Sequence, residues 1–296
     1  MKFKVKQKDL SKHINIVQKG ISSRTTIQIL DGILIETLND KLKLTSTDLE
    51  ISIETFLDAE VKEEGSIVAN SRIFGDIIKK LPDSIIEVEV KDNKINIKCE
   101  NSEFNILGNY AVDYPDLPII LQKENLKLSV ESLKNAIRQT VFATSQDETR
   151  PTLSGVLVEI ENNNISFVSL DGYRLALMKL NTDYNIDLKI IIPGRILNEI
   201  NKILEDTEED VILSAAPGHV LFNLGDTIIY SRLLEGQFFN YKDIIRDDHK
   251  TKVIVNKKDF QNALERVQTW LPVIGKSFIA CKRGKSKFNQ IKYNWW

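Results

Sequence analysis

The side chains that most often carry enzyme chemistry are few in this chain and are not spaced for it. The three histidines, His13, His219 and His249, lack the spacing of metal ligands. The tripeptide G-K-S at 275–277 could end a phosphate-binding loop, but the upstream glycine that such a loop requires is replaced by Trp270. We therefore expect no catalytic centre, no bound metal and no cofactor.

Charge is the more informative chemistry. The 296 residues include 40 Lys and Arg against 42 Asp and Glu, a net of -2 that at first argues against a nucleic-acid partner. The five expected helices together carry +7, however, which leaves -15 on the remainder of residues 1–267. These helices are at 8–19, 70–81, 131–141, 194–204 and 257–267. Exposed helices are often rich in lysine, but five that agree in sign indicate one positive surface on an acidic protein.

The elements that position these charges repeat along the chain. Five pairs of like residues recur at an offset of 123: Leu10 with Leu133, Gly32 with Gly155, Asp48 with Asp171, Arg72 with Arg195, and Val88 with Val211. The offset drifts to 127 where Y-P-D-L (114–117) meets Y-K-D-I (241–244), and residues 253–264 begin a third copy. The recurrence of the aspartates favours a shared turn over a catalytic pair.

Each copy shows strands interrupted by two amphipathic helices. Alternating apolar runs predict strands at 27–37, 41–46, 50–57, 85–91 and 94–99, and in the second copy at 153–160, 164–170, 174–180, 187–192 and 210–215. Two helices per copy break this pattern, at 8–19 and 71–81 and then at 131–142 and 194–204. The fold class is therefore α+β, with repeated domains in which two helices back antiparallel sheets.

Seven stretches, in a fixed order and spacing, carry a resemblance to one known family. They lie at 23–35, 45–50, 69–82, 114–118, 142–157, 171–176 and 192–195. They resemble the bacterial sliding clamp, the beta subunit of DNA polymerase III, and the similarity runs from Met1 to about Val267.

This resemblance implies the DNA-clamp fold and a topological function. It divides the chain into clamp domain 1 (1–122), clamp domain 2 (123–248) and the start of domain 3 (249–267). The family implies a head-to-tail homodimer ring around duplex DNA, with helices lining the hole and no reading of base sequence. Such a ring tethers the replicative DNA polymerase and supports processive replication without being an enzyme. The polymerase and the clamp loader would bind it through apolar peptide motifs.

Two groups of residues match functional positions of the family. The DNA-facing positions are matched by Arg24, Arg72, Gln146, Arg150 and Arg195. The second-domain wall of the partner-peptide cleft is matched by Leu153, Leu170, Gly172, Tyr173, Arg174, Leu175 and Ile244. The alternatives are that Arg24 pairs with a carboxylate, that Arg195 lies along its helix, and that Leu153 and Leu175 are strand core.

The similarity ends after Val267. Residues 268–296 form a basic and aromatic tail that we do not expect to be a folded domain. A frameshift or truncation would explain it, as would a tail that grips single strands by stacking. An incomplete third domain predicts poor ring closure and loading, and the alternative function is a clamp-like protein that binds clamp partners without a closed ring.

The rest of the composition favours the cytoplasm. Two cysteines, Cys99 and Cys281, cannot make a disulfide framework, and no apolar run is long enough to span a bilayer. The charged N-terminus does not fit a signal peptide. We expect a cytoplasmic protein with no membrane partner.

Overall fold

The computed structural model describes residues 1–22, 25–117, 125–147, 149–184, 186, 188–205, 209–245 and 253–268. The chain divides into two compact units, Met1–Phe239 and Asn240–Trp296. Each unit is described by itself.

The first half of the larger unit contains nine strands and two helices among its described residues. The strands are β1 (Lys2–Lys6), β2 (Gly32–Leu38), β3 (Lys41–Thr47), β4 (Ile51–Asp58), β5 (Glu60–Glu63), β6 (Gly65–Asn70), β7 (Ile85–Lys91), β8 (Lys94–Cys99) and β9 (Ser102–Asn109). The helices are α1 (Gln7–Val17) and α2 (Ser71–Lys80), and short 3-10 turns occur at Gln18–Gly20, Gln28–Asp31 and Ala111–Asp113.

The second half repeats this order. Its strands are β10 (Asn125–Ser129), β11 (Gly155–Glu161), β12 (Asn164–Leu170), β13 (Leu175–Asn181), β14 (Lys189–Pro193), β15 (Asp210–Ala216), β16 (His219–Asn223) and β17 (Thr227–Arg232). Its helices are α3 (Val130–Thr140) and α4 (Gly194–Ile203), with 3-10 turns at Val141–Ala143 and Pro151–Ser154. The expected α+β class is confirmed.

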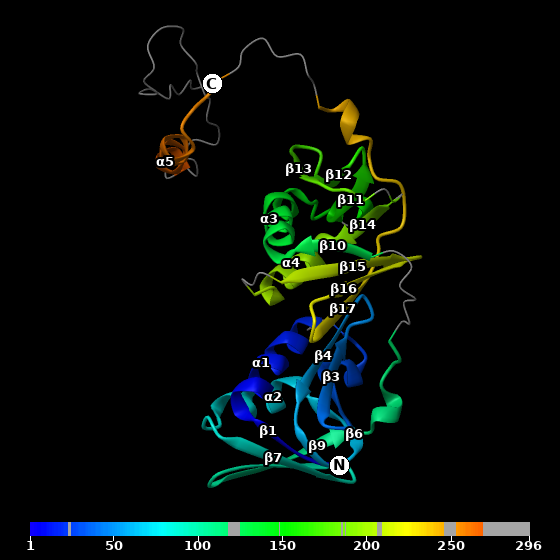
Figure 1. The fold of residues 1–296 in the computed structure, drawn as a ribbon, viewed down its shortest axis with the longest axis vertical. Helices are drawn as coiled ribbons and strands as arrows, with labels where there is room; N and C mark the ends of the chain where they lie inside the picture. The colour runs from blue at the N-terminus through cyan, green and yellow to red at the C-terminus, as the bar shows by residue number, and fades with distance from the viewer. Residues whose placement is uncertain are drawn as a thin grey trace. The chain divides into compact units, whose positions relative to one another are not determined.

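One antiparallel strand pair joins the two halves into a common sheet. Strand β17 of the second half pairs with β4 of the first, and thirteen strands follow one another in the order β10-β15-β16-β17-β4-β3-β2-β6-β9-β8-β7-β1-β5. A second sheet has the order β13-β12-β11-β14. Figure 1 shows the four helices of this unit, α1 and α2 in blue and α3 and α4 in green, along the same side of the strands.

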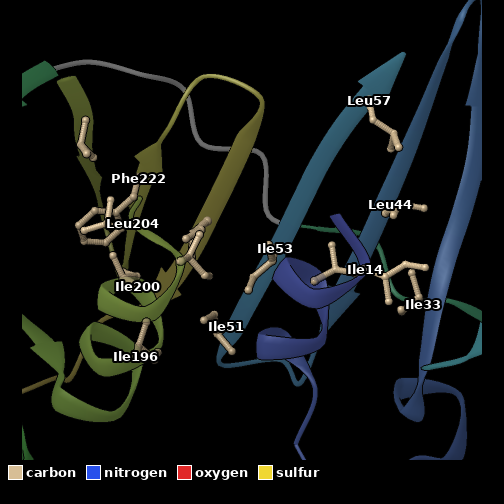
Figure 2. Close-up of a cluster of buried hydrophobic side chains, with 14 of the residues drawn as sticks. Ile14, Ile33, Leu44, Ile51, Ile53, Leu57, Ile196, Ile200, Leu204 and Phe222 are labelled. Carbon is tan, nitrogen blue, oxygen red and sulfur yellow. The ribbon is translucent and has the colours of Figure 1, made fainter. Parts of the chain in front are cut away.

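Burial of the apolar helix faces against the sheets forms the core. Ile14 of α1 lies over the buried strand residues Leu44 and Ile53 of the first half. In the second half, Ile196 and Ile200 of α4 lie near the buried Leu204 and Phe222. Figure 2 shows these two groups on either side of the β17–β4 pair. Full burial of each such side chain contributes about 1.5–3 kcal/mol relative to its exposure.

Side-chain caps mark the starts of α2 and α3. The Asn70 side chain accepts from the Ile73 amide at the start of α2, and the Ser129 side chain does the same for Ser132 at the start of α3. The helix predictions are confirmed within a few residues at their ends. Residues 27–31, expected as strand, lie outside β2 and mostly form a 3-10 turn, and the ranges predicted for strands did not include β1, β5, β6, β9, β10, β16 or β17.

The hydrogen bonds define the repeat more closely than the sequence does. The offset of 123 holds for the paired strands β3 and β12, since Ser46 faces Ile53 as Ser169 faces Ala176. After the second helix of each copy the offset is 125, since the Gly108 amide donates to Asn93 O as the Leu233 amide donates to Gly218 O. The expected pair of Val88 with Val211 is therefore shifted by two residues.

The smaller unit contains a 3-10 turn at Tyr241–Asp243 and the helix α5 (Lys257–Gln268). This helix confirms the one expected at 257–267. The tail at 269–296 lies outside the described residues. In the part of the chain that is described, no helix is long and apolar enough to cross a membrane.

Candidate nucleic-acid interface

The four helices of the larger unit carry exposed cations with different degrees of pairing. Lys8 pairs with Asp83, Lys12 with Glu205 and Lys202 with Glu199. A second set is exposed and has no acidic partner within 4.0 Å among the described residues. It comprises Lys19, Arg72, Lys79, Lys80 and Arg138. Lys134 is different, because its side chain is buried and its Nζ donates to Leu204 O at 3.0 Å. It therefore adds no charge to the helix surface.

Helices α1 and α4 border a basic hollow of about 470 Å³. Its polar lining includes Lys8, Lys12, Lys19 and Lys202, with one acidic residue, Glu205. We call this surface the basic hollow. Sequence reasoning counted these lysines in the charge of the helices but did not single them out, because nothing in the sequence shows that α1 and α4 meet across the two halves.

Arg195, expected to face DNA, is held by two carboxylates of the first half. Its Nη2 lies 2.9 Å from Asp48 Oδ2 and 3.0 Å from Glu50 Oε2. Partial burial alone would lower the pKa of the guanidinium, but the hydrogen bonds and charges of Asp48 and Glu50 outweigh burial and raise it. Arg195 thus pairs with carboxylates, the alternative considered for Arg24, and its side chain remains 51% exposed.

The other expected DNA-facing residues are distributed around the same helices. Gln146 is exposed and lines a hollow of about 750 Å³ together with Arg195 at the start of α4. Arg150 is exposed in the loop before η5 (Pro151–Ser154), and Arg72 is exposed in the first turn of α2. Arg24 lies outside the described residues. The structure brings Gln146 and Arg195 together, while Arg72 lies in the other half.

A polar network closes the joint between the two halves. Tyr230 of β17 donates its hydroxyl to Glu54 Oε2 at 2.9 Å, and Glu54 Oε1 lies 2.5 Å from Lys43 Nζ. Burial and the Glu54 charge raise the pKa of the Tyr230 hydroxyl. Burial would lower the pKa of Lys43, but the hydrogen bond and charge of Glu54 raise it. Both groups therefore keep their protons, and the phenol and the ammonium both bind the carboxylate.

A second part of this joint is centred on Thr55. Its Oγ1 shares a 2.6 Å hydrogen bond with Nδ1 of the buried His13 and lies 2.9 Å from Thr227 Oγ1. The backbone adds Phe56 N to Asp226 O at 2.9 Å and Arg232 N to Glu50 O at 2.8 Å. The two halves are therefore bound by main-chain pairing and by matched buried polar groups.

The expected turn at Asp48 and Asp171 is confirmed. Asp48 Oδ1 accepts from the amides of Glu50 and Ile51 at 3.0 and 2.9 Å. Asp171 Oδ1 accepts from the amides of Tyr173 and Arg174 at 3.0 and 3.1 Å. These backbone bonds lower the pKa of Asp171 and keep it ionised. Each aspartate thus shapes the turn that leads into a strand.

The expected partner wall gathers around the second of these turns. Gly172 has φ +92 and Tyr173 is fully exposed. The Arg174 guanidinium lies 3.0 Å from Asp171 and 5.6 Å from the centre of the Phe142 ring. Phe142, 56% exposed, is an apolar neighbour that sequence reasoning missed. Its position at a helix end gave no periodic signal.

The remaining wall residues are placed differently. Leu153 and Leu170 are buried, but Leu153 lies in the 3-10 turn Pro151–Ser154 and not in a strand, as the alternative interpretation had it, and Leu175 is half-buried at the start of β13. Ile244 is 48% exposed and belongs to the smaller unit. Within the described residues, no group of three or more His, Cys, Asp or Glu side chains could hold a metal ion.

Repeated α+β domains, a sheet continued from one domain into the next and cationic helices on one side define the class of DNA-clamp proteins. Models of the DNA polymerase III beta subunit match residues 1–118 with its N-terminal domain and residues 127–240 with its central domain. The chain belongs to this family, and its role in DNA replication is that of a sliding clamp.

Individual relatives agree with this assignment. The beta sliding clamp of Bacillus subtilis is 39% identical over 277 residues, which are 90% of this chain and 73% of that protein. The crystal structure of the B. subtilis clamp has a TM-score of 0.87 at 38% identity, covering 90% of this chain and 73% of that one. A putative DNA polymerase III beta subunit from Eubacterium rectale has a TM-score of 0.89 at 34% identity, covering 92% and 76%. The alternative of a clamp-like protein without a ring gains no support from these relatives.

Proposed function

We propose that copies of this chain form a closed ring around duplex DNA and hold it through phosphates alone. The observation that carries the proposal is the basic hollow between α1 and α4, which contains the unpaired cation Lys19, together with the exposed unpaired cations Arg72 on α2 and Arg138 on α3. Lysine and arginine contacts to phosphate are independent of base sequence and weaken with salt. A surface of this kind lets a ring slide.

The pairing of several helix cations favours weak contact. Arg195, Lys12 and Lys202 each already have a carboxylate partner, so a phosphate must compete with Asp48, Glu205 or Glu199 respectively. Gln146, Arg150 and, outside the described residues, Arg24 complete the proposed DNA-facing set. Contacts that are already partly compensated bind DNA loosely, which suits sliding better than tight binding.

The partner peptides of the polymerase and the clamp loader would bind at the wall formed by Gly172, Tyr173, Arg174 and Leu175, with Leu153 and Leu170 beneath it. The fully exposed ring of Tyr173 and the exposed ring of Phe142 offer apolar surface beside the cation of Arg174. Ile244 belongs to this proposal on the resemblance alone. The chain itself would be non-catalytic, need no cofactor and work in the cytoplasm.

The DNA contact is tested with a triple variant of the basic hollow, Lys12→Ala/Lys19→Ala/Lys202→Ala. Binding of the full chain to linear duplex DNA is measured by fluorescence anisotropy between 50 and 200 mM salt. Each lost phosphate contact should reduce the slope of log affinity against log salt by about 1. The matched control is Lys41→Ala/Lys91→Ala/Lys94→Ala, which removes the same charge from exposed strand ends. Equal loss in both variants would contradict a specific helix surface.

The partner wall is tested with Tyr173→Ala. Binding of a labelled apolar peptide that carries a clamp-binding motif should weaken about tenfold, because an exposed aromatic anchor is lost. Tyr173 is fully exposed, so folding should not change. Tyr110→Ala, 59% exposed on the other half, is the control and should bind normally. Normal binding by the Tyr173 variant would reject the wall.

A further inference from the structure

The turn before β4 borders a further hollow of about 810 Å³ at the joint between the two halves. Its apolar lining includes the buried Leu30, together with Ile27 and Leu49, which are 47% and 55% exposed. Among the residues that the structure describes, its charged lining consists of Asp48, Glu50 and Arg195. We call this surface the joint hollow. It combines exposed aliphatic side chains with two carboxylates against one guanidinium.

The repeat gives the joint hollow the same backbone frame as the partner wall. The 3-10 turns before β2 and β11 correspond at the offset of 123. In the first half the Leu30 amide donates to Ile27 O at 3.1 Å, and in the second half the Leu153 amide donates to Arg150 O at 3.0 Å. The two aspartate turns complete the frame on the other side. The same frame therefore forms a hollow in each half.

The side chains on this common frame differ in charge. At the offset of 123, Arg150 of the second half is replaced by Ile27 in the first, and Tyr173 is replaced by Glu50. The carboxylate of Glu50 is 65% exposed, whereas the partner wall presents the guanidinium of Arg174, which is 56% exposed. Complementary charge selects partners at an exposed surface. The joint hollow therefore favours a cation on its ligand, and the partner wall favours an anion.

Leu49 is exposed in a backbone conformation that disfavours a side chain. Its φ of 73 lies in the left-handed region, where its counterpart Gly172, at 92, meets no steric penalty. The Leu49 amide donates to Thr47 Oγ1 at 3.0 Å, which holds the turn in this conformation. Glycine would suit the turn better, so the leucine contributes apolar surface at the hollow and not stability.

We propose that the joint hollow binds an extended peptide of another protein in which a lysine or arginine lies beside aliphatic residues. The aliphatic side chains would cover Ile27 and Leu49, and the cation would bind Glu50. Glu50 lies 3.0 Å from Arg195, but Arg195 also binds Asp48, whose side chain is only 6% exposed. A ligand cation can therefore share or take Glu50 while Arg195 keeps Asp48. The inference rests on the proposed partner wall only for the type of ligand, a short apolar peptide.

The probe is the labelled peptide A-V-L-K-L-A, acetylated and amidated so that its lysine carries its one charge. Its binding to the full chain is measured by fluorescence anisotropy beside the matched peptide A-V-L-E-L-A. The lysine peptide should bind about tenfold more tightly, because the glutamate places a like charge against Glu50. Glu50→Gln should remove most of this preference. The control Glu60→Gln, which changes a carboxylate of equal exposure on β5, should keep it.

The apolar contact is tested with Leu49→Gly, which copies the residue of the second half and keeps the turn intact. Binding of the lysine peptide should weaken about fivefold, because a half-exposed aliphatic side chain no longer covers the ligand. The control Leu38→Ala removes an aliphatic side chain that is 47% exposed at the end of β2, and it should bind normally. Equal losses in the two variants would contradict a defined site.

The inference is overturned if the wild-type chain binds neither peptide or binds both equally, or if Leu49→Gly binds the lysine peptide normally. Loss of this binding in Tyr173→Ala would place the peptide at the partner wall and would overturn the inference as well. Failure of the Tyr173→Ala prediction with the clamp-binding motif, or of the salt dependence with DNA, rejects only the proposed function. The two proposals therefore fail separately.

Discussion

The turns at Asp48 and Asp171 have the same construction but lead into very different strands. Both aspartates cap two backbone amides, and both turns contain a residue with positive φ, Leu49 at 73 and Gly172 at 92. Strand β4, after the first turn, is covered by β17, whereas β13, after the second, is a sheet edge. The two turns have the same geometry, so β4 and β13 differ in whether a further strand pairs with them.

The neighbour determines which residue types each strand carries. Where β17 covers β4, buried polar groups find partners: Glu54 binds Tyr230 and Lys43, and Thr55 binds His13 and Thr227. The counterparts in the second half are apolar. They are Leu177 for Glu54, Met178 for Thr55 and Ala136 for His13. A buried polar group is stable only where its partner is fixed, which explains why the repeat preserves the fold and changes the polarity.

Removing Glu54 should have the largest effect of the changes considered. Glu54→Ala leaves Lys43 and the Tyr230 hydroxyl without their carboxylate in a largely buried site, although Lys43 keeps Glu36 at 3.4 Å. We expect a loss of about 3 kcal/mol in the free energy of unfolding, measured by urea denaturation. Glu54→Leu, which copies the residue of β13, should also destabilise.

A triple variant that also replaces Lys43 and Tyr230, the two partners of Glu54, sharpens the comparison. Glu54→Leu/Lys43→Met/Tyr230→Phe should regain most of the lost stability, because apolar groups then replace the whole network. A neutral effect of Glu54→Leu alone would show that the covering strand does not dictate the polarity of β4.

The two turns provide a smaller and opposite pair of effects. Gly172→Ala should lower the free energy of unfolding by about 1 kcal/mol, because an alanine in the left-handed region is strained even though open space surrounds it. Leu49→Gly should raise it by up to about 0.5 kcal/mol, since relief of strain exceeds the entropy that glycine adds to the unfolded chain. Thermal unfolding monitored by circular dichroism measures both. Two changes of the same sign would mean that the turns are not equivalent.

The sequence predicted what is local and repeated, and it missed what depends on contact between the halves. The helices and the aspartate turns follow from periodicity and capping, and both are observed. Among the missed strands, β17 pairs with β4 of the other half, and β9 pairs with β6 only at Gly108 and Asn109. The hydroxyl of Tyr230 in β17 finds its partner Glu54 only in the other half, whereas Asn105 of β9 accepts from Asn96 Nδ2 within its own copy.

The candidate site shows the same division. The charge on the helices was predicted, but the pairing of Arg195 with Asp48 joins residues 147 apart in sequence. No spacing rule connects them. The burial of Lys134 against Leu204 O is likewise a product of packing. The net charge of a helix therefore overestimates the number of its cationic side chains that are available to bind a phosphate.

Acidification should lower the free energy of unfolding through His13 of the first half, and we expect this effect to be the smallest. Burial lowers the pKa of the His13 imidazole below its usual 6.5, and this outweighs the nearby Asp226 carboxylate, which raises it. The unfolded chain then binds more protons than the folded chain between the folded pKa and 6.5. The contribution of His13 to stability is thus fully present above pH 6.5 and falls as the pH drops through that window. Urea denaturation from pH 8 to pH 5 measures it, with His13→Gln as the matched variant. Because glutamine does not titrate, the difference in stability between the two proteins should shrink as the pH falls, and a constant difference would show that His13 stays neutral across the range.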